Sequence, residues 1–159
     1  MRVVVQHLVV EVARDGRVVV YMGDDQANDY VYKFVSDNAY VEGNASLNRD
    51  LLDSGKLYVA RFTNGATASD MMGVGEWIHL DKTANATLAA DNVNFPDQAA
   101  VLVKARMAAD AVGATKMDRP EWVTVHPTTQ EVYLTLTNNS SRALAAIDDA
   151  NPREANRFG

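Results

Sequence analysis

Apolar and polar residues alternate along most of this chain with the two-residue period of β-strands. Segments with this pattern lie at residues 3–12, 18–22, 30–35, 57–62, 76–80, 123–127 and 131–139. The segment from Tyr30 to Val35 is the clearest, because aromatic and β-branched residues favour strands and alternate along it. Asp15 and Gly16 separate the first two segments and form a strong tight-turn signal. The chain is therefore expected to fold mainly as consecutive β-hairpins.

One segment departs from this pattern and predicts a helix over about residues 97–112. Pro96 precedes the segment and Gly113 follows it, which is the usual asymmetry of helix ends. Its charged side chains are expected to face water: Lys104, Arg106 and Asp110. The strand clusters recur at a spacing near the ~40–45 residues of a propeller blade. The expected fold is mainly β, a partial β-propeller of a few blades with one inserted α-helix, in a single domain over residues 1–159.

Composition narrows the classes of function. A chain of 159 residues with 47% hydrophobic and 23% charged residues suits one ordinary globular domain. The net charge of −6 disfavours a general affinity for nucleic acid or for an anionic membrane. The chain has no cysteine, which excludes disulfides, zinc ribbons, cysteine nucleophiles and cysteine-ligated iron within it.

The chain shows no targeting or membrane segment. No apolar run is long enough to span a bilayer. Residues 1–10 are apolar but lack the charged region and the cleavage site of a secretory signal peptide. The N-terminus enters strand-like sequence at once, and the C-terminus has no obvious closing element. We therefore expect both ends to be truncated.

The most informative stretch is residues 117–122, Met-Asp-Arg-Pro-Glu-Trp, where a strand pattern begins. The guanidinium of Arg119 offers a planar fork that suits phosphate oxygens. The carboxylate of Glu121 is a hard oxygen ligand that suits calcium. Residues two apart on an extended chain share a face, so both side chains are expected on one side and Trp122 on the other. The plain alternative is a surface ion pair, worth ~0–1 kcal/mol.

Other residues offer weaker signals. Asp24 and Asp25 end a strand at a polar loop and are either metal ligands or ordinary turn residues. The histidines do not pair at metal-ligand spacing, and His126, before Pro127, is expected to be a turn residue. No nucleophile elbow, P-loop or dinucleotide-binding loop is present. Several tyrosines lie at strand spacing and are expected to pack rather than to stack on bases: Tyr21, Tyr30, Tyr32, Tyr58 and Tyr133.

Several of these motifs, taken together and in order, resemble the PhoX-type alkaline phosphatase family. The matching stretches are residues 18–25, 29–36, 48–53, 55–62, 108–122, 125–127, 131–133, 135–139 and 151–153. The resemblance runs from about Asp15 to the C-terminus. A single Arg-Pro-Glu match would be weak, whereas several long motifs in the right order are specific.

This resemblance implies a function and a set of site residues. Members of the family are secreted or periplasmic phosphomonoesterases, built as β-propellers whose mouth holds calcium and iron, with phosphate bound over the metals. Arg119 resembles the family's phosphate-clamping arginine, and Glu121 resembles a carboxylate that bridges metals. The turn that contains Asp24 and Asp25 is a plausible loop lining the mouth. The expected catalytic residues are thus Arg119 and Glu121, with Arg119 binding substrate and Glu121, Asp24 and Asp25 as candidate metal ligands.

The chain also departs from the family pattern. Family members are much longer, and their iron-ligating cysteine, a metal-binding asparagine and a further aspartate lie outside this chain. Where the family has His-Glu-Gly-Ala, residues 5–9 here are Val-Gln-His-Leu-Val. Gln6 or a neighbour therefore takes the place of a metal-binding glutamate, and an amide brings no charge to a hard cation. We expect this chain alone not to assemble the full metal cluster and to be inactive.

The leading hypothesis is a fragment or truncated relative of a metal-dependent phosphomonoesterase that acts on phosphomonoesters in its intact parent. The first alternative is a non-catalytic, propeller-like binding module that holds calcium or an anion. A further alternative is a propeller hydrolase of the lactonase type. Exposed β edges template association, so self-association of the chain is also expected.

Overall fold

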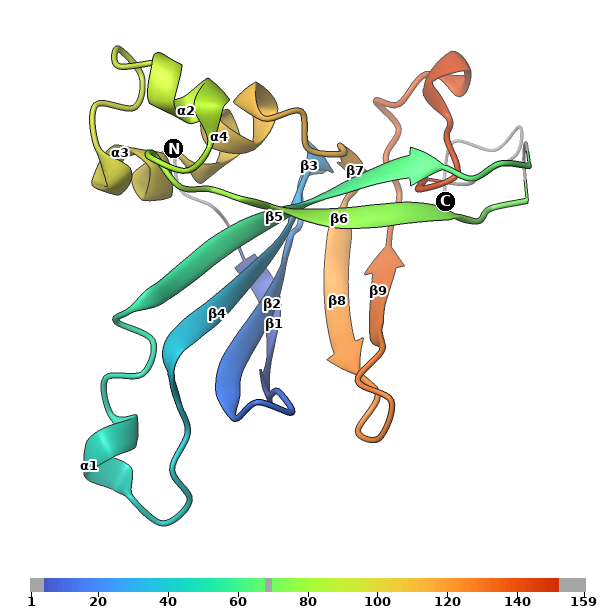
Figure 1. Cartoon of the computed structure of the whole chain (residues 1–159). Coiled ribbons are helices and arrows are strands. Elements are labelled where there is room, and N and C mark those ends of the chain that lie inside the picture. Colours follow the sequence, from blue (N-terminus) through green and yellow to red (C-terminus); the bar gives the residue numbers. More distant parts are fainter. Residues whose placement is uncertain (1–4, 68–69, 152–159) are drawn as a thin grey trace.

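The computed structural model describes residues 5–67 and 70–151, and only the backbone of Val5 and Gln6. Its main element is an antiparallel sheet of five strands in the order β1-β2-β4-β5-β6. These strands are β1 (Val5–Val12), β2 (Arg17–Asp24), β4 (Val31–Ala39), β5 (Gly55–Asn64) and β6 (Gly73–His79). Figure 1 shows the strand direction turning progressively from β1 to β6, as the twist of an open sheet requires.

The first hairpin confirms the predicted tight turn. Val12 pairs with Val18 across β1 and β2, and Gly16 adopts a positive φ of 85° between them. Only glycine reaches this conformation without steric cost. The carboxylate of Asp15 accepts hydrogen bonds from the backbone and the side chain of Arg17, which fixes the turn from outside.

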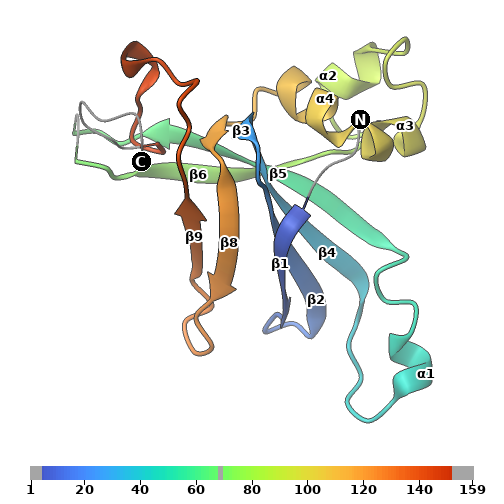
Figure 2. The same cartoon turned by 180° about the vertical axis from the view of Figure 1, so that it is seen from behind.

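Two small sheets of two strands each complete the β structure. One pairs β3 (Ala27–Asp29) with β7 (Met117–Asp118), and the other pairs β8 (Pro120–Val125) with β9 (Val132–Leu136). Figures 1 and 2 show β8 lying beside β1 and β2 from both sides, and β3 and β7 meeting at the top of this junction. Leu134 and Leu136 on β9 pack toward Val31, Ala60 and Met117, so the second hairpin covers one face of the large sheet.

The helices differ from the expectation of a single inserted helix, which is wrong. The described residues contain four short α-helices: α1 (Ala45–Asn48), α2 (Ala86–Ala90), α3 (Gln98–Val103) and α4 (Ala105–Ala111). A single 3₁₀ turn, η1 (Leu144–Ala146), follows them. The segment predicted at 97–112 has the expected limits, because Asp97 caps its start and Gly113, at φ 71°, follows its end. Lys104 interrupts it with a φ of −105° and a ψ of 37°, which leaves two helices.

The main hydrophobic core lies between the sheet and the helices. Helices α2, α3 and α4 gather at one end of the sheet, beside β5 and β6 (Figure 1). The buried residues of this core are Tyr30, Tyr32, Val59, Leu80, Leu88, Phe95, Val101, Ala105, Ala108, Ala109 and Val112. The packing role expected of Tyr30 and Tyr32 is confirmed, whereas Tyr133 is exposed.

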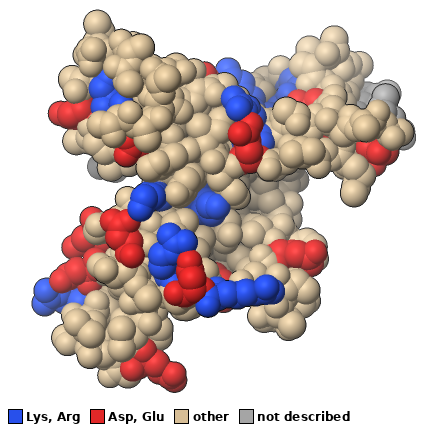
Figure 3. All heavy atoms as spheres, in the orientation of Figure 1, with Lys and Arg blue, Asp and Glu red and all other residues tan. Residues whose placement is uncertain are grey.

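The fold class is mainly β, as predicted, and the described residues form no closed barrel. The propeller remains a prediction. Within the part of the chain that the structure describes, no helix is long and apolar enough to cross a membrane. On the face drawn in Figure 3, acidic and basic side chains alternate, so the net charge of −6 is not gathered there into one large patch.

Candidate active site

Three charged side chains meet where β2 ends and β8 begins, and they form the Asp25–Arg119–Glu121 cluster. Nη2 of Arg119 lies 3.0 Å from Oδ1 of Asp25 and 3.6 Å from Oε1 of Glu121. The carboxylate of Asp25 is 2% exposed, whereas the side chains of Glu121 and Arg119 are 22% and 37% exposed. A buried acid therefore anchors a guanidinium that still reaches solvent.

The close approach of β2 to β8 brings Asp25 to this place. A Cβ atom on Gly23 would lie 2.5 Å from the carbonyl oxygen of Pro120, a distance that real Cβ contacts do not show. Glycine at this position allows the end of β2 to rest against the first residues of β8. Asp25 follows two residues later and thus lies beside Arg119, although 94 positions separate them.

Arg119 has an unusual backbone conformation. Its φ is 49°, in the left-handed region, and it stands between β7, which ends at Asp118, and β8, which begins at Pro120. The expectation of an extended chain through Arg119 is therefore wrong, although Arg119 and Glu121 do lie together. The left-handed region costs a residue with a Cβ about 1–2 kcal/mol. Such strain persists only where the surroundings fix the conformation, and it often marks functional sites.

Neighbouring side chains hold Glu121 and Trp122. The hydroxyl of Thr137 on the segment after β9 donates a hydrogen bond of 2.9 Å to Oε1 of Glu121. Trp122 is exposed and stacks on the ring of His7, with ring centroids 4.8 Å apart. The strand thus directs Glu121 toward the cluster and Trp122 toward β1.

The electrostatics of the cluster favour an added cation. Burial raises the pKa of Asp25; the Arg119 guanidinium opposes this shift, and the nearby Glu121 carboxylate adds to it. Oδ1 of Asp25 is buried and accepts no hydrogen bond. The Arg119 guanidinium lies against this oxygen in an ion pair, with Nη2 at 3.0 Å, so a metal ion bound here would share the carboxylate with Arg119. Two carboxylates are only part of the six to eight oxygen ligands that calcium takes. No group of three or more acidic, histidine or cysteine side chains suited to a metal occurs in residues 5–67 and 70–151.

Asp24 lies elsewhere. Its side chain is fully buried and accepts two hydrogen bonds from Arg106 on α4, at 2.6 Å from Nε and 2.5 Å from Nη2. Asp25 rather than Asp24 therefore faces Arg119 and Glu121. The expectation that Arg106 faces water is wrong, because Asp24 draws its guanidinium into the protein.

A second buried network precedes Arg119. Oδ1 of Asp118 accepts hydrogen bonds from Nδ2 of Asn139 at 2.6 Å and from Nε of Arg142 at 2.5 Å. The backbone amide of Asp118 donates to the side chain of Asn151 at 2.8 Å. Two of these residues, Asn139 and Asn151, belong to the motifs at 135–139 and 151–153, but the sequence alone assigned neither residue a role. Pro152 and Arg153 lie outside the described residues, as does the side chain of Gln6.

The histidines take no part in the cluster. Nδ1 of His126 accepts hydrogen bonds from the backbone amides of Thr128 and Thr129, which confirms it as a turn residue. Nδ1 of His7 accepts a hydrogen bond of 3.3 Å from the amide of Val123 and so joins β1 to β8.

A cleft of about 350 Å³ lies elsewhere, between the far ends of β5 and β6 and the hairpin β8–β9. Its lining is mostly apolar: Phe62, Thr63, Met71, Gly73, Gly75, Met117, Leu134, Leu136, Asp149 and Ala150. None of the Asp25–Arg119–Glu121 cluster lines this cleft. The paired charges that phosphate chemistry needs are at the cluster, so we take the cluster, and not this apolar cleft, as the candidate site.

Comparison with known proteins identifies the family of the chain. The family model of alkaline phosphatase PhoX matches residues 5–159, and the chain belongs to this family. The resemblance seen in the sequence is confirmed.

Among solved structures, the chain is similar to Pseudomonas fluorescens PhoX in complex with vanadate, a transition state analogue. The identity is 49% and the TM-score 0.75, over 84% of this chain and 23% of that one. The chain thus spans less than a quarter of the length of this solved relative. No curated protein matches it significantly.

Proposed function

We propose that this chain is the part of a PhoX-type phosphomonoesterase that binds the phosphoryl group through Arg119 and contributes Asp25 and Glu121 to a metal centre. One observation carries the proposal: the guanidinium of Arg119 is fixed by a buried carboxylate while part of it stays open to solvent. A fixed, exposed fork is suited to two oxygens of a phosphate.

The chemistry of the reaction explains why these groups belong together. Hydrolysis of a phosphomonoester needs positive charge around the transferring group, held in place before the reaction. Asp25 holds the guanidinium of Arg119 in position, and Thr137 orients the carboxylate of Glu121. Calcium and iron, the metals we propose for the intact parent, would supply further positive charge and an activated oxygen nucleophile when bound.

The proposal assigns different parts to the two neighbouring aspartates. Asp25 lies beside Glu121 and pairs with the partly exposed guanidinium of Arg119, so it is the better candidate ligand. Asp24 is already neutralised by Arg106 and supports the turn instead. Because two carboxylates do not complete a calcium site, residues beyond the described part would supply the remaining ligands in a longer parent, which we propose to be secreted or periplasmic.

Vanadate binding tests the role of Arg119 without requiring turnover. We expect the chain to bind vanadate weakly, and Arg119→Ala to weaken the binding at least tenfold in a calorimetric or ⁵¹V NMR titration. Arg49→Ala is a matched control, because Arg49 is an exposed arginine that pairs with Asp50 and lies far from the cluster. Equal affinity of the wild type and Arg119→Ala, or no binding by the wild type, would contradict the proposal.

Hydrolysis of p-nitrophenyl phosphate by a full-length parent, with and without calcium and iron, separates the alternatives. We expect no turnover by the chain alone, and loss of metal-dependent vanadate binding in Glu121→Ala. A non-catalytic module would bind calcium or an anion but remain inactive even within the full-length parent. The family match favours the phosphatase over a lactonase-type hydrolase.

A further inference from the structure

Both halves of the cluster follow the same local arrangement. Asp25 and Arg119 are each directly preceded in the chain by a buried aspartate, Asp24 and Asp118 respectively. Each of these aspartates is paired with a buried arginine that comes from a distant part of the chain. The residue before each of the two site residues is thus fixed by its own ion pair, Asp24 with Arg106 and Asp118 with Arg142.

Arg106 holds the loop on both sides of Asp25. Its Nε and Nη2 atoms donate to the carboxylate of Asp24, while Nη1 donates to Oε1 of Gln26 at 3.0 Å. One guanidinium therefore binds the residue before Asp25 and the residue after it. The position of Asp25 between two fixed neighbours follows from these contacts.

Arg142 acts in the same way on the chain that leads into Arg119. Its Nε donates to Asp118 at 2.5 Å, and Nη2 donates to the carbonyl oxygen of Lys116 at 2.6 Å. Two of the three residues before Arg119 are thereby fixed to one guanidinium. This matters because Arg119 itself has a φ of 49°, a conformation that needs support from its surroundings.

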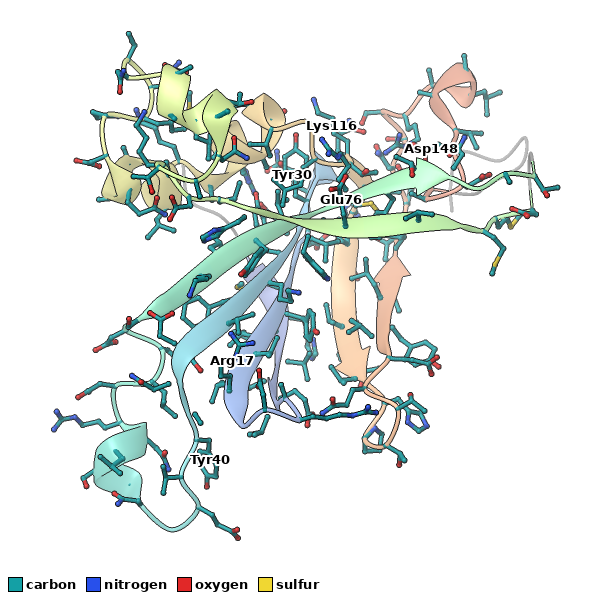
Figure 4. The ribbon with its side chains drawn as sticks, in the orientation of Figure 1. Arg17, Tyr30, Tyr40, Glu76, Lys116 and Asp148 are labelled. Atoms are coloured by element: carbon teal, nitrogen blue, oxygen red, sulfur yellow. The ribbon has the colours of Figure 1, made fainter. Side chains whose placement is uncertain are left out.

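Helix α4 connects the two halves. Asp110 lies one turn after Arg106 on this helix, so both side chains project from the same face. The carboxylate of Asp110 accepts a hydrogen bond from the hydroxyl of Tyr30 and lies 3.3 Å from Nζ of Lys116. In Figure 4, Tyr30 and Lys116 lie close together at this junction. The same helix therefore contacts the loop of Asp25 and the segment before Arg119.

We propose that Arg106 and Arg142 are positioning residues, which act through Asp24 and Asp118 to hold the Asp25 carboxylate against the Arg119 guanidinium. Buried ion pairs are weak evidence for stability, because the cost of removing both charges from water offsets their attraction. In our proposal these ion pairs fix the positions of Asp25 and Arg119 rather than add to the stability of the fold. The purpose of this arrangement in phosphate binding rests on the function proposed above.

The test follows the Arg119 guanidinium itself by NMR of the ¹⁵N-labelled chain. It uses the Nη2–H signal, because Nη2 is the atom that contacts Asp25, and assigns this signal by its loss in Arg119→Lys. In the wild type we expect the signal of an arginine held by a carboxylate. In Arg106→Gln and in Arg142→Gln we expect it to move to the position typical of free arginines. Val101→Ala is the control, because it removes a fully buried side chain from α3 and lowers stability without touching either ion pair.

Gln26→Ala covers the case in which the arginine variants do not fold. Gln26 is exposed, so its truncation removes one contact of Arg106 and leaves the core intact. A smaller shift of the Arg119 signal in the same direction is expected. An Arg119 signal that is unchanged in Gln26→Ala, or as little changed in the folded arginine variants as in Val101→Ala, would overturn the proposal.

A vanadate titration of the same variants separates this proposal from the function. If the wild type binds no vanadate, the proposed function fails, while the Arg119 signal still tests the positioning role. If the wild type and Arg106→Gln bind vanadate equally and show the same Arg119 signal, the positioning role fails and the proposed function stands.

Discussion

Arg119 illustrates how one residue can combine a functional side chain with an unfavourable backbone. Its guanidinium contacts Asp25 and Glu121 only because the backbone turns into the left-handed region at φ 49°. Glycine would adopt this conformation freely, but it has no side chain to place beside Asp25 and Glu121 or to take the phosphate-binding role that we propose. At this position arginine is less favourable for stability than glycine, and a loss of stability of this kind is common at functional sites.

Substituting Arg119 by glycine and by alanine should expose this cost. Both variants lack the guanidinium, so their difference reports the backbone alone. We expect Arg119→Gly to be more stable than Arg119→Ala by about 1 kcal/mol in urea unfolding. At Thr124, an exposed position on β8, the order should reverse by about 0.5–1 kcal/mol. Alanine more stable than glycine at both positions would show that Arg119 is not strained.

Asp29 should make stability depend on pH. Burial raises the pKa of Asp29 to about 6; the negative charge of Asp24 adds to the shift, and Arg106 opposes it. Asp110 and Lys116 also face this carboxyl, with smaller and opposite effects. Between about pH 4 and pH 6 the folded state then binds more protons than the unfolded state, so stability falls as pH rises.

The variant Asp29→Asn should remove this dependence, because the amide does not titrate. We expect it to gain about 2 kcal/mol relative to the wild type between pH 4 and pH 7.5. Urea unfolding at both pH values measures the difference. A difference between variant and wild type that is constant over this range would contradict the raised pKa of Asp29.

At single residues, the sequence predicted that Arg119 and Glu121 lie together, but it did not predict the buried ion pairs around them. The spacing of Arg119 and Glu121 indicated that they lie together, although the reason given, an extended strand, was wrong. Arg106 was expected to face water because it is one of the charged side chains of the helical segment. Its partner Asp24 lies 82 positions away, and no periodicity within a helix can reveal such a contact.

At the scale of elements, Gly23 decides how the end of β2 meets β8. A Cβ atom here would lie 2.5 Å from the carbonyl oxygen of Pro120, and a backbone atom cannot move aside as a side chain can. The two strands would have to separate, which shifts Asp25 away from Arg119. Adding a single methyl group at Gly23 should therefore alter the geometry of the cluster.

We expect Gly23→Ala to lower the free energy of unfolding by about 1–3 kcal/mol, as overpacking does, and to weaken vanadate binding. Gly75→Ala on the edge strand β6 is the control, since its Cβ would meet only the ring of Phe62, at 3.0 Å. That ring is partly exposed and can rotate, so this variant should stay within about 0.5 kcal/mol of the wild type. Equal effects in urea unfolding would contradict the close approach of β2 and β8.

Element boundaries were predicted well where local signals were strong. Pro96, Asp97 and Gly113 mark the limits of the helical segment, and the cap and the following glycine lie where the sequence places them. The break at Lys104 was not predicted, since no proline or glycine marks it in the sequence. The ammonium group of Lys104 donates to the carbonyl oxygen of Asn94, a contact outside the helix. Helices α1 and α2 last little more than one turn, which is too short for a periodic pattern.

For the molecule as a whole, the large sheet has one face that is incompletely covered. Leu8 and Val10 on β1 are 50% and 51% exposed, and Val12 continues the same row. Their partners on β2 are Met22, Val20 and Val18, of which Val18 and Val20 are buried in a small core with Leu51. The apolar face thus extends to the edge strand, where the described residues no longer cover it.

The apolar row on β1 makes self-association of this chain the expected behaviour, because an edge strand also presents unpaired backbone groups. We expect the mass measured by light scattering to rise with concentration, and to rise further with salt, which screens the repulsion between chains of net charge −6. Val10→Lys should restore the monomer by placing a charge in the row.

The control variant is Val93→Lys, which changes the net charge by the same amount at a position that is 89% exposed and lies away from β1. This variant should leave association unchanged. Because both variants carry the same charge, a monomer in only the first would locate the contact at β1. A wild-type monomer at every concentration would show that the row is too small to drive association, and equal loss in both variants would make net charge, not the β1 face, the controlling factor.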